Sequence, residues 1–129
     1  PFAHWITPAG VPKRFDTHFL LIAAPVGQLG AHDGGESVEG LWIRPQQALQ
    51  EAEAGTRTLV FATQMNLIKL TRYATVTEAI AAARASPVVT VLPRGERLPD
   101  GRRRLQIPAE AGYGGTEFVV SVPPAMQPR

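Results

Sequence analysis

The 129-residue sequence contains no cysteine. This absence excludes disulfide bonds, thiolate zinc sites and cysteine nucleophiles, and it fits a reducing compartment, so we expect a cytoplasmic protein. No apolar run approaches the roughly 18 residues of a membrane-spanning helix, and we expect no membrane association. The chain starts with proline, and no basic and apolar leader follows, which predicts a processed chain or a fragment.

Motifs of several enzyme classes are also missing. The sequence has no Gly-x-Ser-x-Gly elbow, no phosphate loop and no Gly-x-Gly-x-x-Gly fingerprint, which disfavours nucleophilic hydrolases, ATPases and dehydrogenases. The histidines, His4, His18 and His32, do not stand at the i, i+2 or i, i+4 separations of zinc ligands. We therefore expect them to be packed or solvated rather than to bind a metal.

Aromatic residues are scarce, at 7% of the chain, and none interleaves with the C-terminal arginines. Nucleic-acid binding surfaces combine basic residues with aromatic stacking platforms. A solvated hairpin face is thus favoured over phosphate binding for these arginines, and we expect no nucleic-acid partner. The residues concerned are Arg84, Arg94, Arg97, Arg102, Arg103 and Arg104.

The composition, 44% apolar and 19% charged, is that of a soluble globular chain. Residues 17–24 form an apolar run between charged residues and Pro25, which predicts a central strand buried on both faces. Glycines at 34 and 35 predict a turn, and residues 38–43 predict a second strand beside the first. Pro45 favours the start of a helix that Gly55 ends.

Helical spacing of apolar residues predicts a second helix over residues 63–73. Thr75-Val76-Thr77-Glu78 matches a capping box that opens an alanine-rich helix, which ends before Ser86-Pro87. Further strands are expected over residues 88–92 and 118–122, and Asp100-Gly101 predicts a hairpin turn. The pattern predicts an α/β chain, more narrowly α+β, with one part over residues 1–92 and a C-terminal hairpin extension over 93–129.

Three motifs follow one another in a fixed order: Trp5-Ile6-Thr7-Pro8, Arg14-Phe15-Asp16-Thr17 and the segment from Glu36 to Trp42. Their order and spacing resemble the C-terminal part of a Nudix hydrolase domain, closest to the coenzyme A diphosphatase branch. The resemblance covers about Phe2 to Leu92. It implies a mixed sheet sandwiched between helices, and hydrolysis of a nucleoside diphosphate linked to another group, with Mg²⁺ or Mn²⁺ as cofactor.

The Nudix metal helix carries a Gly…Glu…Arg-Glu…Glu-Glu…Gly signature, which these residues lack. The resemblance therefore implies that the N-terminal half of the fold is absent, and that a completing segment or a second copy is a partner. Residues 51–55, Glu-Ala-Glu-Ala-Gly, imitate only the end of the signature, and an exposed helix face explains them better. A non-catalytic module that binds a nucleotide or a protein stays open as the alternative function, so enzyme activity is uncertain.

The resemblance also implies site residues. Glu36 and Glu39 are candidate catalytic residues and, at most, secondary metal ligands, against the alternative of an exposed strand edge. Arg14 is a candidate phosphate contact, since a guanidinium presents paired donors, and the alternative is a structural pair with Asp16 or with a nearby carboxylate. Phe15 and Asp16 complete the expected substrate-binding set. For Phe15, Trp5 and Trp42, core packing is favoured over stacking on a substrate.

Overall fold

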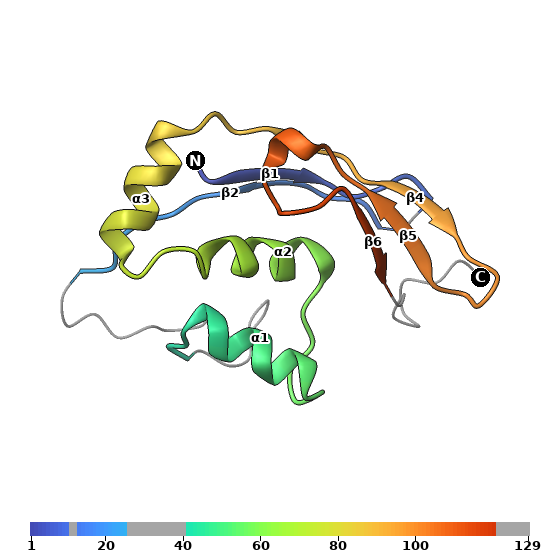
Figure 1. Ribbon diagram of the computed structural model, residues 1–129, viewed down its shortest axis with the longest axis horizontal. Coiled ribbons are helices and arrows are strands. Elements are labelled where there is room, and N and C mark those ends of the chain that lie inside the picture. The colour runs from blue at the N-terminus through green and yellow to red at the C-terminus, as the bar shows by residue number, and fades with distance from the viewer. Residues whose placement is uncertain (11–12, 26–40, 121–129) are drawn as a thin grey trace. The chain divides into compact units, whose positions relative to one another are not determined.

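The computed structural model describes residues 1–10, 13–25 and 41–120 (Figure 1). The chain forms two compact units, of which the first contains Pro1–Leu21 and Ile80–Arg129 and the second contains Ile22–Ala79. Helices and small sheets occur together, so the chain belongs to the mixed α+β class that the sequence predicted. The predicted boundary after Leu92 falls inside the first unit.

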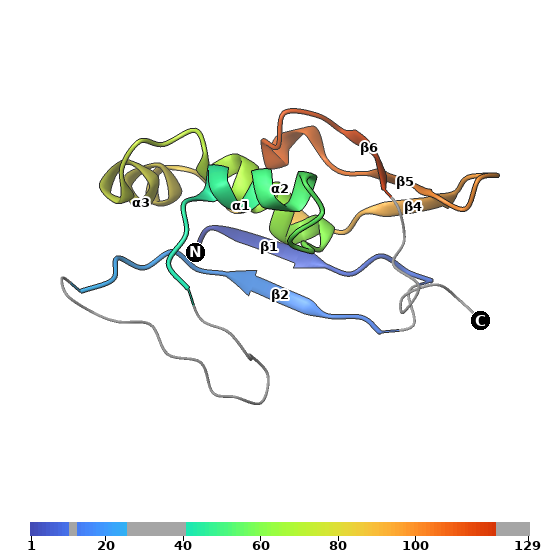
Figure 2. The ribbon, with the colours of Figure 1, turned by 90° about the horizontal axis from the view of Figure 1, so that it is seen from below.

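The first unit is built on a mixed three-stranded sheet (Figure 2). The strand β1 (Ala3–Ile6) lies in the centre, antiparallel to β2 (Asp16–Phe19) and parallel to β3 (Thr90–Val91). Ala3 and Trp5 are buried, while the alternate residues of β1 are only partly buried. Because successive side chains of a strand point to opposite faces, this alternation gives the sheet one core face and one more open face.

A second sheet of the same unit is antiparallel throughout, in the order β4 (Arg94–Arg97), β5 (Arg103–Gln106) and β6 (Glu117–Val120). The predicted turn at Asp100-Gly101 is confirmed, since it joins β4 to β5 and Gly101 adopts a φ of 88°. Between β5 and β6 the chain forms a short 3₁₀ helix, η1 (Ala109–Ala111).

The two sheets meet through aromatic residues. Trp5 of the first sheet is 4% exposed, and its Nε1–H donates a hydrogen bond of 2.9 Å to the hydroxyl of Tyr113, which follows η1. The two rings also pack edge to face, with centroids 5.3 Å apart. Val91 of β3 is fully buried, and it lies opposite Trp5 in the parallel register. The core of the first unit is therefore centred on Trp5.

The described residues of the second unit form helices and the segments that flank or join them. The first, α1 (Pro45–Glu53), has Pro45 in its first turn and Gly55 at a φ of 81° just after its end, as the sequence predicted. It is followed by α2 (Phe61–Leu70), which buries Met65. The third helix, α3 (Val76–Ala85), runs from the second unit into the first.

The capping box at the start of α3 is confirmed. The backbone N–H of Glu78 donates to the hydroxyl of Thr75 at 3.1 Å. The Glu78 carboxylate in turn accepts from the N–H of Ala74 at 3.0 Å. Backbone N–H groups at a helix start have no partner within the helix, so these local bonds satisfy them.

Two strand predictions were wrong. The apolar run over 17–24 is not a buried central strand, because β2 ends at Phe19 and is an edge strand among the described residues. Leu20 and Ile22 beyond it are 72% and 90% exposed. The predicted strand over 38–43 is not formed at residues 41–43, and its remainder lies outside the described residues. An apolar run becomes a central strand only where strands pair with both of its edges, which periodicity cannot reveal.

Two other strands are present but shorter than predicted. The segment 88–92 contributes only Thr90 and Val91 to the first sheet. The last strand begins at Glu117 and extends to Val120, at the end of the described residues. No helix in residues 1–10, 13–25 or 41–120 is long and apolar enough to cross a bilayer.

Asp100 gives the hairpin a pH-dependent contribution to stability. The backbone N–H of Arg102 and then its guanidinium, 2.7 Å from the carboxylate, hold the pKa of Asp100 below its ordinary value of about 3.8. A carboxyl group whose pKa is lower in the folded state stabilises the fold above its unfolded-state pKa, and this stabilisation is lost as the pH falls through the folded pKa.

We therefore expect Asp100→Asn to lower the free energy of unfolding at pH 7 by a small amount that disappears near pH 2. Urea unfolding of the two proteins at both pH values measures this difference. Because the Asp100 side chain is exposed to solvent and salt, the effect should also shrink at high ionic strength. An equal loss of stability at both pH values would show that the carboxylate charge is not involved.

Candidate metal centre

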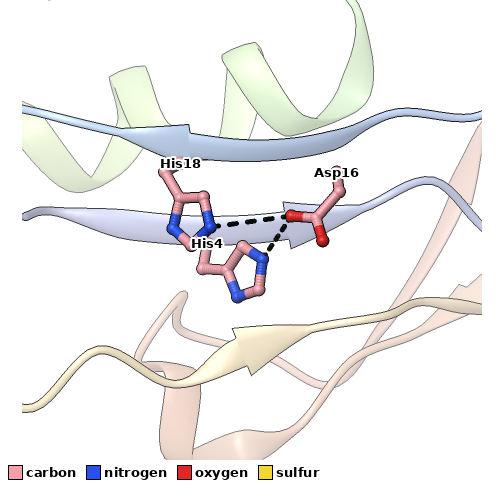
Figure 3. A group of neighbouring side chains, drawn as sticks. All are labelled: His4, Asp16 and His18. Atoms are coloured by element: carbon pink, nitrogen blue, oxygen red, sulfur yellow. Dashed lines mark hydrogen bonds and ion pairs between the residues drawn. The ribbon is translucent and has the colours of Figure 1, made fainter.

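His4, Asp16 and His18 gather on the more open face of the first sheet (Figure 3). His4 belongs to β1, whereas Asp16 and His18 are two residues apart on β2 and so point to the same face. The antiparallel register places His4 directly opposite His18 and Ile6 opposite Asp16. The β1–β2 pairing therefore assembles the cluster on the face opposite Trp5.

The carboxylate of Asp16 links the two imidazole rings. Its Oδ1 atom lies 2.5 Å from Nε2 of His4 and 3.8 Å from Nε2 of His18. The two rings are stacked, with centroids 4.0 Å apart and planes within 4° of parallel. One ligand atom from each residue, all within 4.8 Å of one another, gives the cluster the size of a metal site.

Thr90 holds the His4 ring from the neighbouring strand β3. Its hydroxyl lies 2.8 Å from Nδ1 of His4, while Nε2 on the other side of the ring faces Asp16. A hydroxyl can donate or accept, so Thr90 satisfies either tautomer of the imidazole. This contact therefore orients the His4 ring in either tautomer.

The cluster is anchored at one end and open at the other. The His4 side chain is 16% exposed, against 61% for Asp16 and 68% for His18. A group from solvent can therefore reach the Asp16 and His18 side without moving the core. Imidazole nitrogens and carboxylate oxygens are ligands for divalent metals, and the His18 and Asp16 side chains have room to adjust around an ion.

The structure gives Arg14 a role within the loop that joins β1 to β2. Its Nε and Nη2 groups both donate to the carbonyl oxygen of Thr7, each at 3.1 Å. Two further hydrogen bonds of 2.9 Å close the same loop. The backbone N–H of Thr7 donates to the carbonyl oxygen of Phe15, and the backbone N–H of Phe15 donates to the hydroxyl of Thr7. The structural alternative for Arg14 was a pair with Asp16 or a nearby carboxylate, but among the described residues the guanidinium donates to the Thr7 carbonyl oxygen instead.

The predictions of core packing for the three aromatic residues had different outcomes. Core packing is confirmed for Trp5, but it was wrong for Phe15 and Trp42, whose exposed fractions are 54% and 64%. The ammonium group of Lys13 lies 5.3 Å from the centre of the Phe15 ring. Exposed fractions of this size leave ring faces of Phe15 and Trp42 accessible to solvent.

Of the other predicted site residues, Glu36 and Glu39 lie outside the described residues. Glu51, in the segment that imitates the metal signature, forms an ion pair of 3.1 Å with Arg57. On the second sheet, Arg104 lies between Glu96 at 3.3 Å and Glu117 at 3.1 Å. These ion pairs fit the solvated hairpin face that the arginine pattern favoured.

The cluster contradicts, for His4 and His18, the prediction that the histidines are isolated, whereas His32 lies outside the described residues. His4 and His18 are far apart in sequence, and they meet only because the register of β1 and β2 makes them opposite residues. A usable signal was present in Asp16-x-His18, which places two ligands on one face of any strand that contains them. The third ligand could not be found without the strand pairing.

Comparison with known proteins found no match to this chain. No protein-family model matches the chain. No curated protein and no solved structure matches it either.

Proposed function

We propose that this chain is part of a Nudix-type hydrolase, which cleaves a nucleoside diphosphate linked to a second group, such as a coenzyme A derivative. The observation that carries the proposal is the arrangement of two of the resembling motifs. Residues 5–8 and 14–17 lie on the hairpin that pairs β1 with β2 in the mixed sheet, closed by the Thr7, Arg14 and Phe15 contacts. A mixed sheet is the framework that the resemblance implies, with helices on its two sides and an N-terminal half supplied by other residues.

Hydrolysis of a phosphoanhydride needs a cation that neutralises the developing negative charge and a base that activates water. Mg²⁺ or Mn²⁺ would supply the charge, with Glu36 and Glu39 as secondary ligands or base. Arg14 uses two donors on Thr7, and a guanidinium carries five, so the same side chain can also face a phosphate. The exposed ring of Phe15 is a stacking surface for a nucleobase.

A non-catalytic binding module is the second candidate function. It is favoured by the lack of the Glu-rich signature, because the carboxylates of that signature hold the catalytic cations in Nudix enzymes. Under this alternative the chain binds a nucleotide or a protein partner without turnover.

The test follows coenzyme A and ADP-ribose by ³¹P NMR in the presence of the full chain and Mg²⁺, whereas for reactions with Mn²⁺, which itself broadens phosphate signals, the ion is removed with a chelator before the products are recorded. Cleavage of the diphosphate into two phosphomonoesters would support the hydrolase. Broadened phosphate signals without cleavage would support the binding module for this chain. Unchanged spectra with both compounds at millimolar concentration would contradict both nucleotide functions.

Arg14→Ala and a phosphate-free ligand are the matched controls. Adenosine shares the base and ribose but has no phosphate, so it should bind more weakly than ADP-ribose if Arg14 contacts the diphosphate. Arg14→Ala should then reduce ADP-ribose binding and leave adenosine binding unchanged. An equal loss for both ligands would assign Arg14 to holding the Thr7 loop alone.

A further inference from the structure

We infer that His4, Asp16 and His18 form a binding site for a divalent transition-metal ion, with Nε2 of His4, Oδ1 of Asp16 and Nε2 of His18 as ligands. This site is separate from the Mg²⁺ or Mn²⁺ chemistry proposed for hydrolysis, and it does not depend on that function. The argument rests on the donor types, on their convergence and on the support that Thr90 gives to His4.

The donor set selects the class of metal. Two imidazoles and one carboxylate suit Zn²⁺, Co²⁺, Ni²⁺ and Fe²⁺, whereas Mg²⁺ and Ca²⁺ prefer oxygen ligands only. Three protein ligands leave at least one coordination position for water or for an oxygen of a bound molecule. The number of protein ligands is therefore that of open metal sites, at which the metal acts as a Lewis acid. Closed structural sites have four protein ligands.

Small movements would let the three atoms share one ion. Metal bonds of about 2.0–2.2 Å to nitrogen and oxygen separate two ligand atoms by roughly 3 Å or more. The 2.5 Å contact between His4 and Asp16 must therefore lengthen slightly, and the half-exposed Asp16 side chain can do this by rotation. The ligand electron pair of an imidazole lies in the ring plane, so two parallel rings cannot aim at one ion. His18, at 68% exposure, can turn toward the ion while His4 stays fixed.

Thr90 supplies the outer contact that metal-binding histidines use. A ligating imidazole usually donates its second N–H to a carboxylate, carbonyl or water, which fixes the ring and its tautomer. The hydroxyl oxygen of Thr90, 2.8 Å from Nδ1, can accept a hydrogen bond from Nδ1–H, and in this tautomer Nε2 of His4 carries no proton and can face the ion. The strand pairings β1–β2 and β1–β3 thus position both the ligands and their support.

The test is a titration of the full chain with Co²⁺ and Zn²⁺, followed by visible absorption for Co²⁺ and by calorimetry for both ions. We expect binding of both, with Co²⁺ absorption bands that report nitrogen ligands. Asp16→Asn and His18→Ala should each weaken binding at least about tenfold, the effect expected when one of three ligands is lost. Asp100→Asn, an exposed carboxylate on the other sheet, should leave the affinity unchanged.

Thr90→Val tests the positioning role, since valine keeps the shape but cannot accept a hydrogen bond. We expect a tenfold to hundredfold loss of Zn²⁺ affinity, in the range of other outer-contact substitutions. Thr90→Ser should restore most of the affinity. A merely structural Thr90 would instead change stability without changing Zn²⁺ affinity.

Two results would contradict metal binding at these three residues. One is the absence of Co²⁺ and Zn²⁺ binding by the unaltered chain. The other is unchanged affinity in both Asp16→Asn and His18→Ala, which would place the ion at other residues. Because Asp16 and His18 are exposed, both variants should fold, and circular dichroism checks this. Displacement of Co²⁺ by equimolar Mg²⁺ would also contradict the assignment to a transition metal.

Discussion

Replacing Trp5 with alanine is expected to lower the free energy of unfolding by about 3–5 kcal/mol, the usual cost of removing a large buried aromatic side chain. Trp5 is 4% exposed, lies opposite the fully buried Val91 and donates to Tyr113. Alanine would leave a cavity between the two sheets of the first unit and would remove the hydrogen bond that the Tyr113 hydroxyl accepts from Trp5. Total stabilities are about 5–15 kcal/mol, so the loss is large enough to unfold a marginal chain.

Trp42 provides the matched control for this prediction. It is 64% exposed, so Trp42→Ala should change the free energy of unfolding by less than about 0.5 kcal/mol. Urea unfolding followed by circular dichroism measures both variants on one scale. Tyr113→Phe should cost about 1 kcal/mol, since it removes the hydroxyl that accepts the hydrogen bond from Trp5. Equal losses for the two tryptophan variants would contradict the core position of Trp5.

Leu105→Ala should destabilise the protein by about 2–5 kcal/mol, because it empties a buried site in the central strand of the second sheet. Leu105 is 5% exposed and is paired with Gly95 on one side and Phe118 on the other. Gly95 has no side chain to fill the space that would open. Thermal or urea unfolding measures the loss, with the transition expected to stay cooperative.

The control for Leu105 lies one position along the neighbouring strand. Val119 pairs with Arg104, so its side chain is on the opposite face of the second sheet, and it is 46% exposed. Val119→Ala should therefore cost much less than Leu105→Ala, well under about 1 kcal/mol. A larger loss for Val119→Ala would mean that the face assigned to solvent is the one that packs.

Local signals predicted the helices and the hairpin turn well. Pro45, Gly55, the Thr75–Glu78 capping box and Asp100-Gly101 act through contacts within a few residues, so their effect can be read from neighbouring positions. The strands were less predictable. The apolar run after Thr17 was assigned to a central strand, yet β2 stops at Phe19 and lies at the sheet edge among the described residues.

The residues of the candidate metal centre were likewise predictable only where the signal is local. Asp16 was predicted as a substrate-binding residue, and it lies in the cluster, but the histidines were expected to be isolated. Two ligands of the cluster, Asp16 and His18, are linked by strand alternation, which the sequence contains. The third ligand and its support come from β1 and β3, and only pairing between distant segments brings them to the same face.

The sequence by itself determined the α+β class, the limits of α1 and α3, the hairpin turn and the exclusion of cysteine chemistry, because composition and short-range contacts decide these properties. The tertiary structure decided which tryptophan is buried, where Arg14 donates its hydrogen bonds and which side chains converge on Asp16. Each of these depends on strand register, where a shift of one residue would move every side chain of a strand to the other face.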